Sequence, residues 1–163
     1  MSQKEKKLTL SGINWLAIVM FGLFGQIAWT IENLYLNIFL YKTVTYDQNA
    51  VAIMVAASAI TATLTTLLMG VASDKAGKRK PFISWGYIIW GISIIAFAFI
   101  SKENIESLFP TADAVILTVA IVVIMDCVMT FFGSTANDAA FNAWVTDITV
   151  PETRGRAEGV LSA

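Results

Sequence analysis

Four long apolar runs, separated by short polar links, constrain this chain more than any other feature. A run of about 20 apolar residues forms a helix long enough to cross the hydrocarbon core of a bilayer, which is about 30 Å thick. Hydrophobic residues make up 56% of the 163 residues and charged residues only 14%, a composition far from that of soluble domains. The sequence therefore predicts an all-α integral membrane protein.

The apolar runs divide the chain into a tail, four spans and a final segment. Transmembrane helices are expected at about residues 13–41, 50–69, 82–100 and 114–144, after a tail at 1–12. The final segment, 148–163, is expected to be a loop followed by the first turns of a fifth helix. The first run continues far past the core of a secretory signal, so we expect it to be retained as a span.

The distribution of basic residues predicts the orientation. Nine of the eleven Lys and Arg residues lie in the N-terminal tail, in the link at 70–80 or in the final segment, whereas only Lys42 and Lys102 lie in the other links. Loops rich in Lys and Arg stay in the cytoplasm. We expect a multi-pass protein of the plasma membrane with its N-terminus, including Lys4, Lys6 and Lys7, in the cytoplasm.

Composition also argues against several classes of function. The formal net charge is −1 and histidine is absent, so neither a nucleic-acid-binding surface nor a histidine-based metal site is expected. Cys127 is the single cysteine and lies within an apolar run, which excludes an internal disulfide. No nucleophile–base pair is visible. We expect no enzyme activity, no cofactor and no metal.

Polar residues in the first span follow the helical repeat. They are Gln26, Thr30, Asn33 and Asn37, and they form one stripe on an otherwise apolar helix. With Trp29 beside it, this stripe is suited to a sugar-like solute, which places its apolar face on the ring and its hydroxyl groups on the amides. The alternative is that the amides join neighbouring helices by hydrogen bonds. Glu32 lies about a third of a turn away, so it faces either the same cavity or a neighbouring helix.

The fourth span carries a wider polar wedge. Its members are Thr130, Ser134, Asn137, Asp138 and Asn142. Asp138 lies about 13 Å from the inner end of the helix, near the membrane midplane, where a charged side chain is costly and is a functional candidate by default. The alternative is a structural pair with a polar group on an adjacent helix. Asp126 is expected about 18 Å further along, at a hydrated outer mouth.

The link between the second and third spans has a distinctive pattern, G-x-x-x-D-x-x-G-K-R-K. It comprises Gly70, Asp74, Gly77, Lys78, Arg79 and Lys80, and Gly77 suits a tight reversal. This pattern resembles the signature loop of the major facilitator superfamily. The polar segment at 135–149 and the following Pro-Glu-Thr-Arg-Gly-Arg at 151–156 are similar to that superfamily too. More narrowly, Asp138 with Phe141, and the Lys78–Phe82 segment, resemble its glycoside-pentoside-hexuronide:cation symporter branch and related sucrose-type carriers.

The resemblance implies roles for particular residues. Asp74 and Arg79 would belong to a cytoplasmic charge network that latches one conformation, with Asp147 as a partner of the arginine. Asp138 would match a position used for sugar or cation binding. Ala62 and Thr66 stand where sodium-coupled members carry two acids, so coupling through a proton on Asp138 or Glu32, or facilitated diffusion, is expected instead.

The resemblance also implies an architecture. Superfamily members have twelve helices in two halves, each half built from two triplets of helices. The chain would then be the N-terminal part of a proton- or cation-coupled symporter of a sugar or other small solute, with the remainder of the transporter as its partner. The alternative from another class is a self-standing four-helix membrane protein that works as a homo-oligomer, either as a scaffold or as a small exporter.

Overall fold

The computed structural model describes residues 10–110 and 113–161, and all regular structure in these residues is helical. In chain order the elements are α2 (Gly12–Phe39), η1 (Leu40–Val44), α3 (Gln48–Ala76), α4 (Lys80–Phe97), α5 (Lys102–Leu108), α6 (Ala114–Gly133), η2 (Ser134–Phe141), α7 (Asn142–Ile148) and α8 (Pro151–Leu161). Lys4, Lys6 and Lys7 of the expected tail, and residues 162–163, lie outside the described part.

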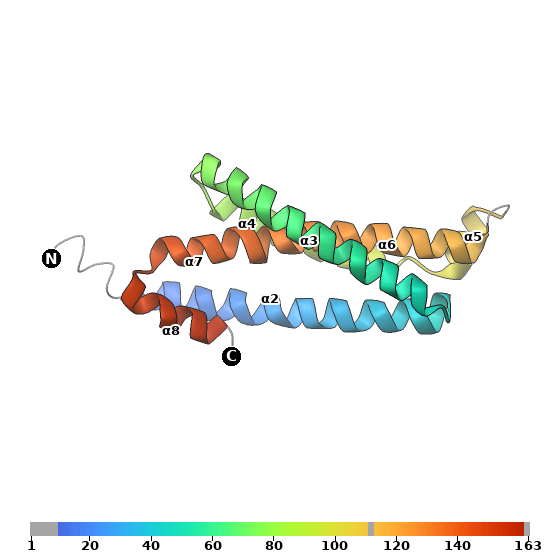
Figure 1. Ribbon diagram of the computed structural model, residues 1–163, viewed down its shortest axis with the longest axis horizontal. Coiled ribbons are helices and arrows are strands. Elements are labelled where there is room, and N and C mark those ends of the chain that lie inside the picture. The colour runs from blue at the N-terminus through green and yellow to red at the C-terminus, as the bar shows by residue number, and fades with distance from the viewer. Residues whose placement is uncertain (1–9, 111–112, 162–163) are drawn as a thin grey trace.

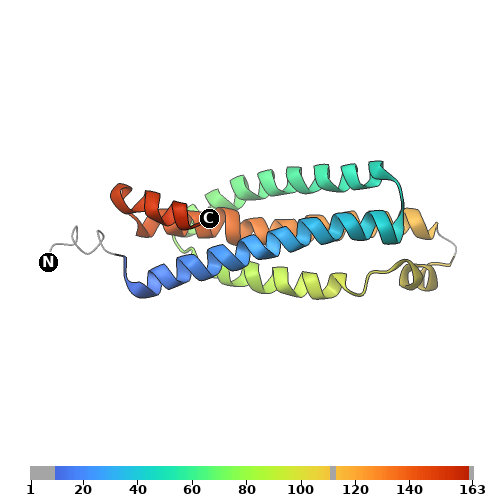
Figure 2. The ribbon, with the colours of Figure 1, turned by 90° about the horizontal axis from the view of Figure 1, so that it is seen from below.

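The helices form an elongated bundle (Figure 1). The continuous rod made of α6, η2 and α7 runs along α2, and α3 crosses both at an angle. Figure 2 shows α2 between α3 on one side and α4 on the other. Helix α8 folds back along the first turns of α2, and α5 lies at the opposite end of the bundle (Figures 1 and 2).

Four helical stretches of the described chain are long and apolar enough to cross a membrane. They are Gly12–Val44, Gln48–Ala76, Lys80–Phe97 and Ala114–Ile148. Large apolar side chains cover their outer faces, as in Leu23, Ile60 and Ile124, which are more than half exposed. Bundles in water bury such side chains, so this pattern fits a chain surrounded by lipid.

Capping side chains define where several helices begin. Ser11, Asp47 and Asp113 each adopt an extended backbone at an N-cap and accept hydrogen bonds from amides of the first turn. These bonds satisfy N–H groups that have no partner within the helix. Gly77 ends α3 with a φ of 62°, a left-handed conformation that glycine adopts without a steric penalty.

The boundaries differ from the sequence expectation in several places. Residues 70–76 are a continuation of α3, so the reversal before α4 takes only residues 77–79. The expected link at 101–113 contains a short helix, α5, which Ser101 caps. Helix α8 begins at Pro151, so the expected loop after the fourth span is shorter than predicted. Polar composition suggested loops at these places, but capping and local hydrogen bonding allow helices there.

Two stretches of π-helix interrupt the regular α-helical repeat. The first, η1, continues the first span to Val44, and the second, η2, covers the eight residues Ser134–Phe141 in the fourth span. The π-helix is rare in proteins overall, and the examples that occur are often found at functional sites. The second stretch includes Asp138, the carboxylate that the sequence singled out.

The buried apolar side chains form two clusters. One lies between α2, η1, α3, α4 and α6 and includes Leu36, Trp90 and Met129. The other joins α2, α4, η2, α7 and α8 around Ile18 and Phe141. Between them these clusters hold α2 against the fourth span, and the polar residues of both helices lie beside them.

Candidate functional site

A polar pocket lies between α2, α3 and α6. It has a volume of about 170 Å³. Its lining residues are Trp29, Asn33, Leu36, Asn37, Met54, Val55, Ser58, Ala59, Ala62, Asp126 and Thr130. Three of the predicted residues of the first span, Trp29, Asn33 and Asn37, therefore share one pocket. Gln26 is exposed and does not line it.

The amide groups of the α2 stripe have different environments. The side chain of Asn33 donates to the carbonyl of Trp29 (2.8 Å), which holds it along its own helix. The Asn37 oxygen is buried and has no hydrogen-bond partner. Buried polar atoms nearly always have a partner, so this oxygen is available to a donor in the pocket.

Asp126 forms the opposite wall of the polar pocket. It is only 6% exposed, and its carboxylate accepts a hydrogen bond from the hydroxyl of Ser58 on α3. The hydroxyl of Thr130 lies 3.4 Å from that of Ser58. The expectation that Asp126 lies at a hydrated mouth is therefore wrong, because α3 packs over this part of the fourth span and covers the carboxylate.

Asp138 lies in a second polar centre, within η2. Asn137 donates from its amide nitrogen to the Asp138 carboxylate (3.2 Å), and Tyr87 of α4 donates to the Asn137 oxygen (2.9 Å). The Trp29 indole and the Ser134 hydroxyl also lie near the Asp138 carboxylate. Asp138 is half-buried, whereas Asn137 and Ser134 are buried. This centre combines polar groups from α2, α4 and the fourth span.

Asn142 is the first residue of α7 and contacts the backbone of η2. Its side chain is exposed and donates to the backbone carbonyl of Asp138 (3.1 Å). It therefore stabilises the backbone where η2 passes into α7, and it makes no hydrogen bond to the Asp138 carboxylate.

Small residues allow η2 to approach its neighbours closely. A Cβ atom at Gly86 of α4 would lie 2.7 Å from that of Ala136. A Cβ atom at Gly25 of α2 would collide with the side-chain oxygen of Asn137. Close approach through small residues is the usual way for membrane helices to pack. These glycines set the position of the segment that carries Asp138.

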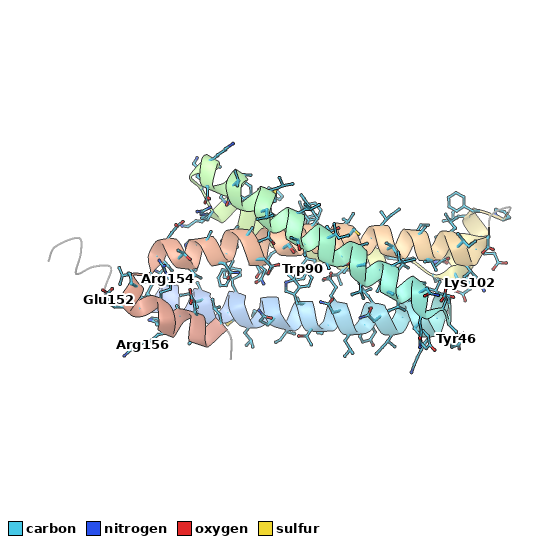
Figure 3. The ribbon with its side chains drawn as sticks, viewed as in Figure 1. Tyr46, Trp90, Lys102, Glu152, Arg154 and Arg156 are labelled. Atoms are coloured by element: carbon cyan, nitrogen blue, oxygen red, sulfur yellow. The ribbon has the colours of Figure 1, made fainter. Side chains whose placement is uncertain are left out.

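Glu32 faces away from the polar pocket, toward α4. It is 5% exposed, and its Oε2 accepts a hydrogen bond from the indole nitrogen of Trp90 (2.6 Å). Its other oxygen, Oε1, has no hydrogen-bond partner. Figure 3 shows Trp90 midway along the bundle, between α2 and the fourth span. Of the two expectations for Glu32, the structure supports a contact with a neighbouring helix.

A charge network occupies one end of the bundle. Arg79 forms ion pairs with Asp74 and with Asp147 (3.0 Å to the latter), and it donates to the hydroxyl of Ser73 (2.6 Å). The hydrogen bond to Asp147, together with that to Asp74, raises the pKa of the Arg79 guanidinium above its ordinary value. The arginine therefore joins the end of α3 to the end of α7.

The other residues of the 70–80 pattern have simpler environments. Lys78 and Lys80 are exposed and form no ion pair that the described chain shows. Gly70 accepts a hydrogen bond from Ser73 (3.0 Å), and a Cβ atom at Gly70 would meet nothing within 4 Å. The left-handed backbone at Gly77 favours glycine there, whereas neither backbone conformation nor packing within the described residues requires glycine at 70.

Several residues of these sites were not predicted. They are Ser58, Ser73, Tyr87, Trp90 and, as a buried wall, Asp126. Serine, tyrosine and tryptophan are common at helix contacts and interfaces, so their positions in the sequence carried no signal. The one available signal was Asp126, a carboxylate inside an apolar run, which by default marks a functional candidate.

The comparisons with known proteins agree with this structure. Residues 10–163 match the family model described as the Major Facilitator Superfamily. No curated protein and no solved structure gave a significant match. The family model covers nearly the whole chain, and the bundle has the multi-pass helical architecture that this match requires. The chain is therefore a member of the Major Facilitator Superfamily, whose members are membrane transporters of small-molecule solutes.

Proposed function

We propose that the chain is the N-terminal part of a secondary active transporter in the plasma membrane. The transporter takes up a sugar-like or similar small solute together with a proton or another cation. The observation that carries this proposal is the pocket between α2, α3 and α6, in which amide, hydroxyl and carboxylate groups meet within helices long enough to span a membrane. Such groups are costly in lipid and occur where solutes or ions pass.

The chemistry of the polar pocket supports a hydroxylated solute. Asn33 and Asn37 supply amides, Asp126 supplies an acceptor, and Trp29 supplies an aromatic face. A pocket of about 170 Å³ is smaller than the roughly 300–1,000 Å³ of a full ligand site. We infer that it is one wall of the binding site and that the remaining helices of the transporter supply the other wall.

Two carboxylates are candidates for ion coupling. Asp138 is half-buried and accepts a hydrogen bond from Asn137, so it is the more accessible of the two carboxylates. Glu32 is buried against Trp90 and is less accessible. Ala62, which lines the polar pocket, and Thr66 stand where sodium-coupled carriers of the melibiose type hold two acids, which argues against sodium coupling. We therefore place the coupling proton on Asp138 first and on Glu32 second.

The orientation follows from charge. The end of the bundle that carries Lys75, Lys78, Arg79, Lys80 and α8 holds most of the described basic residues, and we assign it to the cytoplasm. The network of Arg79 with Asp74 and Asp147 then lies at the cytoplasmic surface, where it can latch one conformation. The resemblance of the Lys78–Phe82 segment, and of Asp138 with Phe141, to the glycoside-pentoside-hexuronide:cation symporter branch supports a proposal that the transporter belongs to that branch.

Uptake into proteoliposomes tests the proposal. A panel of sugars is supplied to the transporter assembled with its remaining helices, with and without an inward proton gradient. We expect gradient-driven accumulation that Asp138→Asn abolishes while insertion is unchanged. Accumulation by Asp138→Asn at the native level would contradict the coupling role. Accumulation by the 163-residue chain alone would favour the self-standing oligomer.

A further inference from the structure

The polar pocket between α2, α3 and α6 contains a carboxylate that no basic side chain of the described residues neutralises. Asp126 is only 6% exposed, and no ion pair in the described part of the chain includes it. None of the residues that line the pocket is Lys or Arg. Glu32 lies close enough for the two carboxylates to repel each other. A buried carboxylate without an opposite charge is costly, so a cationic occupant would stabilise this arrangement.

The two hydroxyl groups of the pocket direct their protons toward Asp126. Ser58 donates to the carboxylate, and Thr130 donates to the Ser58 oxygen (3.4 Å). A hydroxyl group has one proton and two lone pairs, so these two bonds use both protons. Toward an occupant of the pocket, Ser58 and Thr130 can therefore act only as acceptors.

The amide groups on the α2 wall also favour an occupant that donates hydrogen bonds. The Oδ1 atom of Asn37 is buried and has no hydrogen-bond partner. The side-chain nitrogen of Asn33 already donates to the carbonyl of Trp29 (2.8 Å). The pocket thus offers acceptors from α2, α3 and α6. A sugar hydroxyl donates one proton, whereas a primary ammonium donates three and also carries the charge that Asp126 lacks as a partner.

The size of the pocket favours an organic cation over a bare metal ion. Its volume of about 170 Å³ is several times the space that one ion or one water molecule needs. A metal ion would need several oxygen ligands drawn closely around it. Trp29 lines the same pocket, and aromatic rings attract ammonium groups. An occupant with an ammonium group and a small carbon skeleton uses all of these features.

We propose that the polar pocket recognises a primary ammonium group, and that the solute of this carrier is an amino sugar or a similarly small hydroxylated amine. Asp126 is the counter-charge, the Asn37 oxygen accepts one N–H, and the ring of Trp29 contacts the carbon skeleton. This proposal rests on the proposed function, because it names the class of solute bound at that site. Asp126 then determines specificity, while Asp138 carries the coupling proton.

Calorimetric titration of the transporter, assembled with its remaining helices, tests this assignment. The probes are glucosamine, galactosamine and mannosamine, each compared with its N-acetyl derivative and its parent hexose, which lack the positive charge. We expect at least one amine to bind about tenfold more tightly than its neutral counterparts, and Asp126→Asn to remove this preference. Binding of the neutral sugars should not change in that variant. Glu106→Gln, which alters an exposed carboxylate on α5, is the control and should retain native binding.

A second variant separates recognition from packing, because Asp126 also accepts a hydrogen bond from Ser58 of α3. The double variant Asp126→Asn with Asn37→Asp moves the carboxylate to the α2 wall of the same pocket. The preference for the amine should return in this variant, although the bond between Ser58 and a carboxylate at 126 does not. A preference that stays lost would mean that Asp126 acts through packing, and the proposal would be wrong.

The remaining outcomes separate this proposal from the proposed function. Neutral sugars that bind and accumulate as well as the amines would leave the proposed function intact and overturn the recognition of an ammonium group. Binding of Na⁺ without binding of any amine would overturn it too. Amines that bind through Asp126 but are not accumulated by the assembled transporter would support the site and contradict the proposed function.

Discussion

At the scale of residues, Asp138 is oriented by a chain of two hydrogen bonds. The Asn137 oxygen accepts from the hydroxyl of Tyr87, so the amide nitrogen of Asn137 is directed at the Asp138 carboxylate. Tyr87 belongs to α4 and Asp138 to η2. A carboxylate that binds a proton or a solute needs a fixed orientation, and here a different helix provides it.

The substitution Tyr87→Phe tests this arrangement. Phenylalanine keeps the ring but removes the hydroxyl that donates to Asn137, so we expect a loss of about 0.5–1.5 kcal/mol in the free energy of unfolding. Thermal unfolding in detergent measures it. Tyr46→Phe is the matched control, because Tyr46 is 78% exposed at the end of the bundle (Figure 3). Equal midpoints for the two variants would show that the Tyr87 hydroxyl contributes nothing.

At the scale of elements, the π-helix η2 is held by close contacts with α2 and α4. Gly25 and Gly86 lie where any larger side chain would meet Asn137 or Ala136. Protein interiors are so closely packed that an added methyl group forces the surrounding backbone to shift. The two glycines therefore fix the distance between Asp138 and the helices that surround it.

The substitution Gly86→Ala should separate α4 from η2. The added Cβ would lie 2.7 Å from the Cβ of Ala136 and 3.2 Å from its backbone, so we expect destabilisation of about 1–3 kcal/mol. Gly91→Ala, in the same helix with open space around its Cβ, provides the control. The midpoints of thermal unfolding in detergent measure the stability of the two variants. If Gly86→Ala is as stable as Gly91→Ala, α4 and η2 are not closely packed at this contact.

The network around Arg79 joins three elements and gives a third prediction. Arg79 is 15% exposed, but its two carboxylate partners are more than half exposed, so solvent screens the pairs and each contributes about 0–1 kcal/mol. That energy is too small to hold the fold but large enough to bias two conformers of similar energy. Arg79→Ala should therefore change transport rate more than thermal stability, and Lys80→Ala should change neither.

Paired spin labels on Lys78 and Thr146 would report the conformers directly. We expect Arg79→Ala to broaden the distribution of distances between them, since the link between the ends of α3 and α7 is lost. Loss of folded protein in parallel with loss of transport would mean that the network is structural and that it is not a latch.

At the scale of the whole molecule, the sequence was sufficient to predict the features that depend on one helix alone. Run length and composition predicted the four long helices, and the glycine at 77 marked the reversal. The fourth span has 35 residues, or roughly 50 Å of helix, which exceeds the thickness of the hydrocarbon core. Depth counted from one end therefore could not show whether Asp126 is exposed or covered by a neighbouring helix.

Contacts between helices could not be predicted in this way. The burial of Asp126 depends on α3 and Ser58, and the direction of Glu32 depends on Trp90 in α4. Neither partner is distinguished by its residue type or spacing. The helical repeat assigned Gln26, Thr30, Asn33 and Asn37 to one face, with Trp29 beside it. It could not show that Gln26 and Thr30 lie outside the polar pocket.

The central claim is that the stripe on α2 lines a solute pathway together with the fourth span, and labelling of introduced cysteines tests it most directly. Cys127 is the single native cysteine, so Cys127→Ser provides the background. In the assembled transporter in membranes, Asn33→Cys and Asn37→Cys should react with a water-soluble maleimide. Ile18→Cys, which is fully buried, should remain unreactive. If cysteines at 33 and 37 are as unreactive as the one at 18, the stripe packs against protein and the account is wrong.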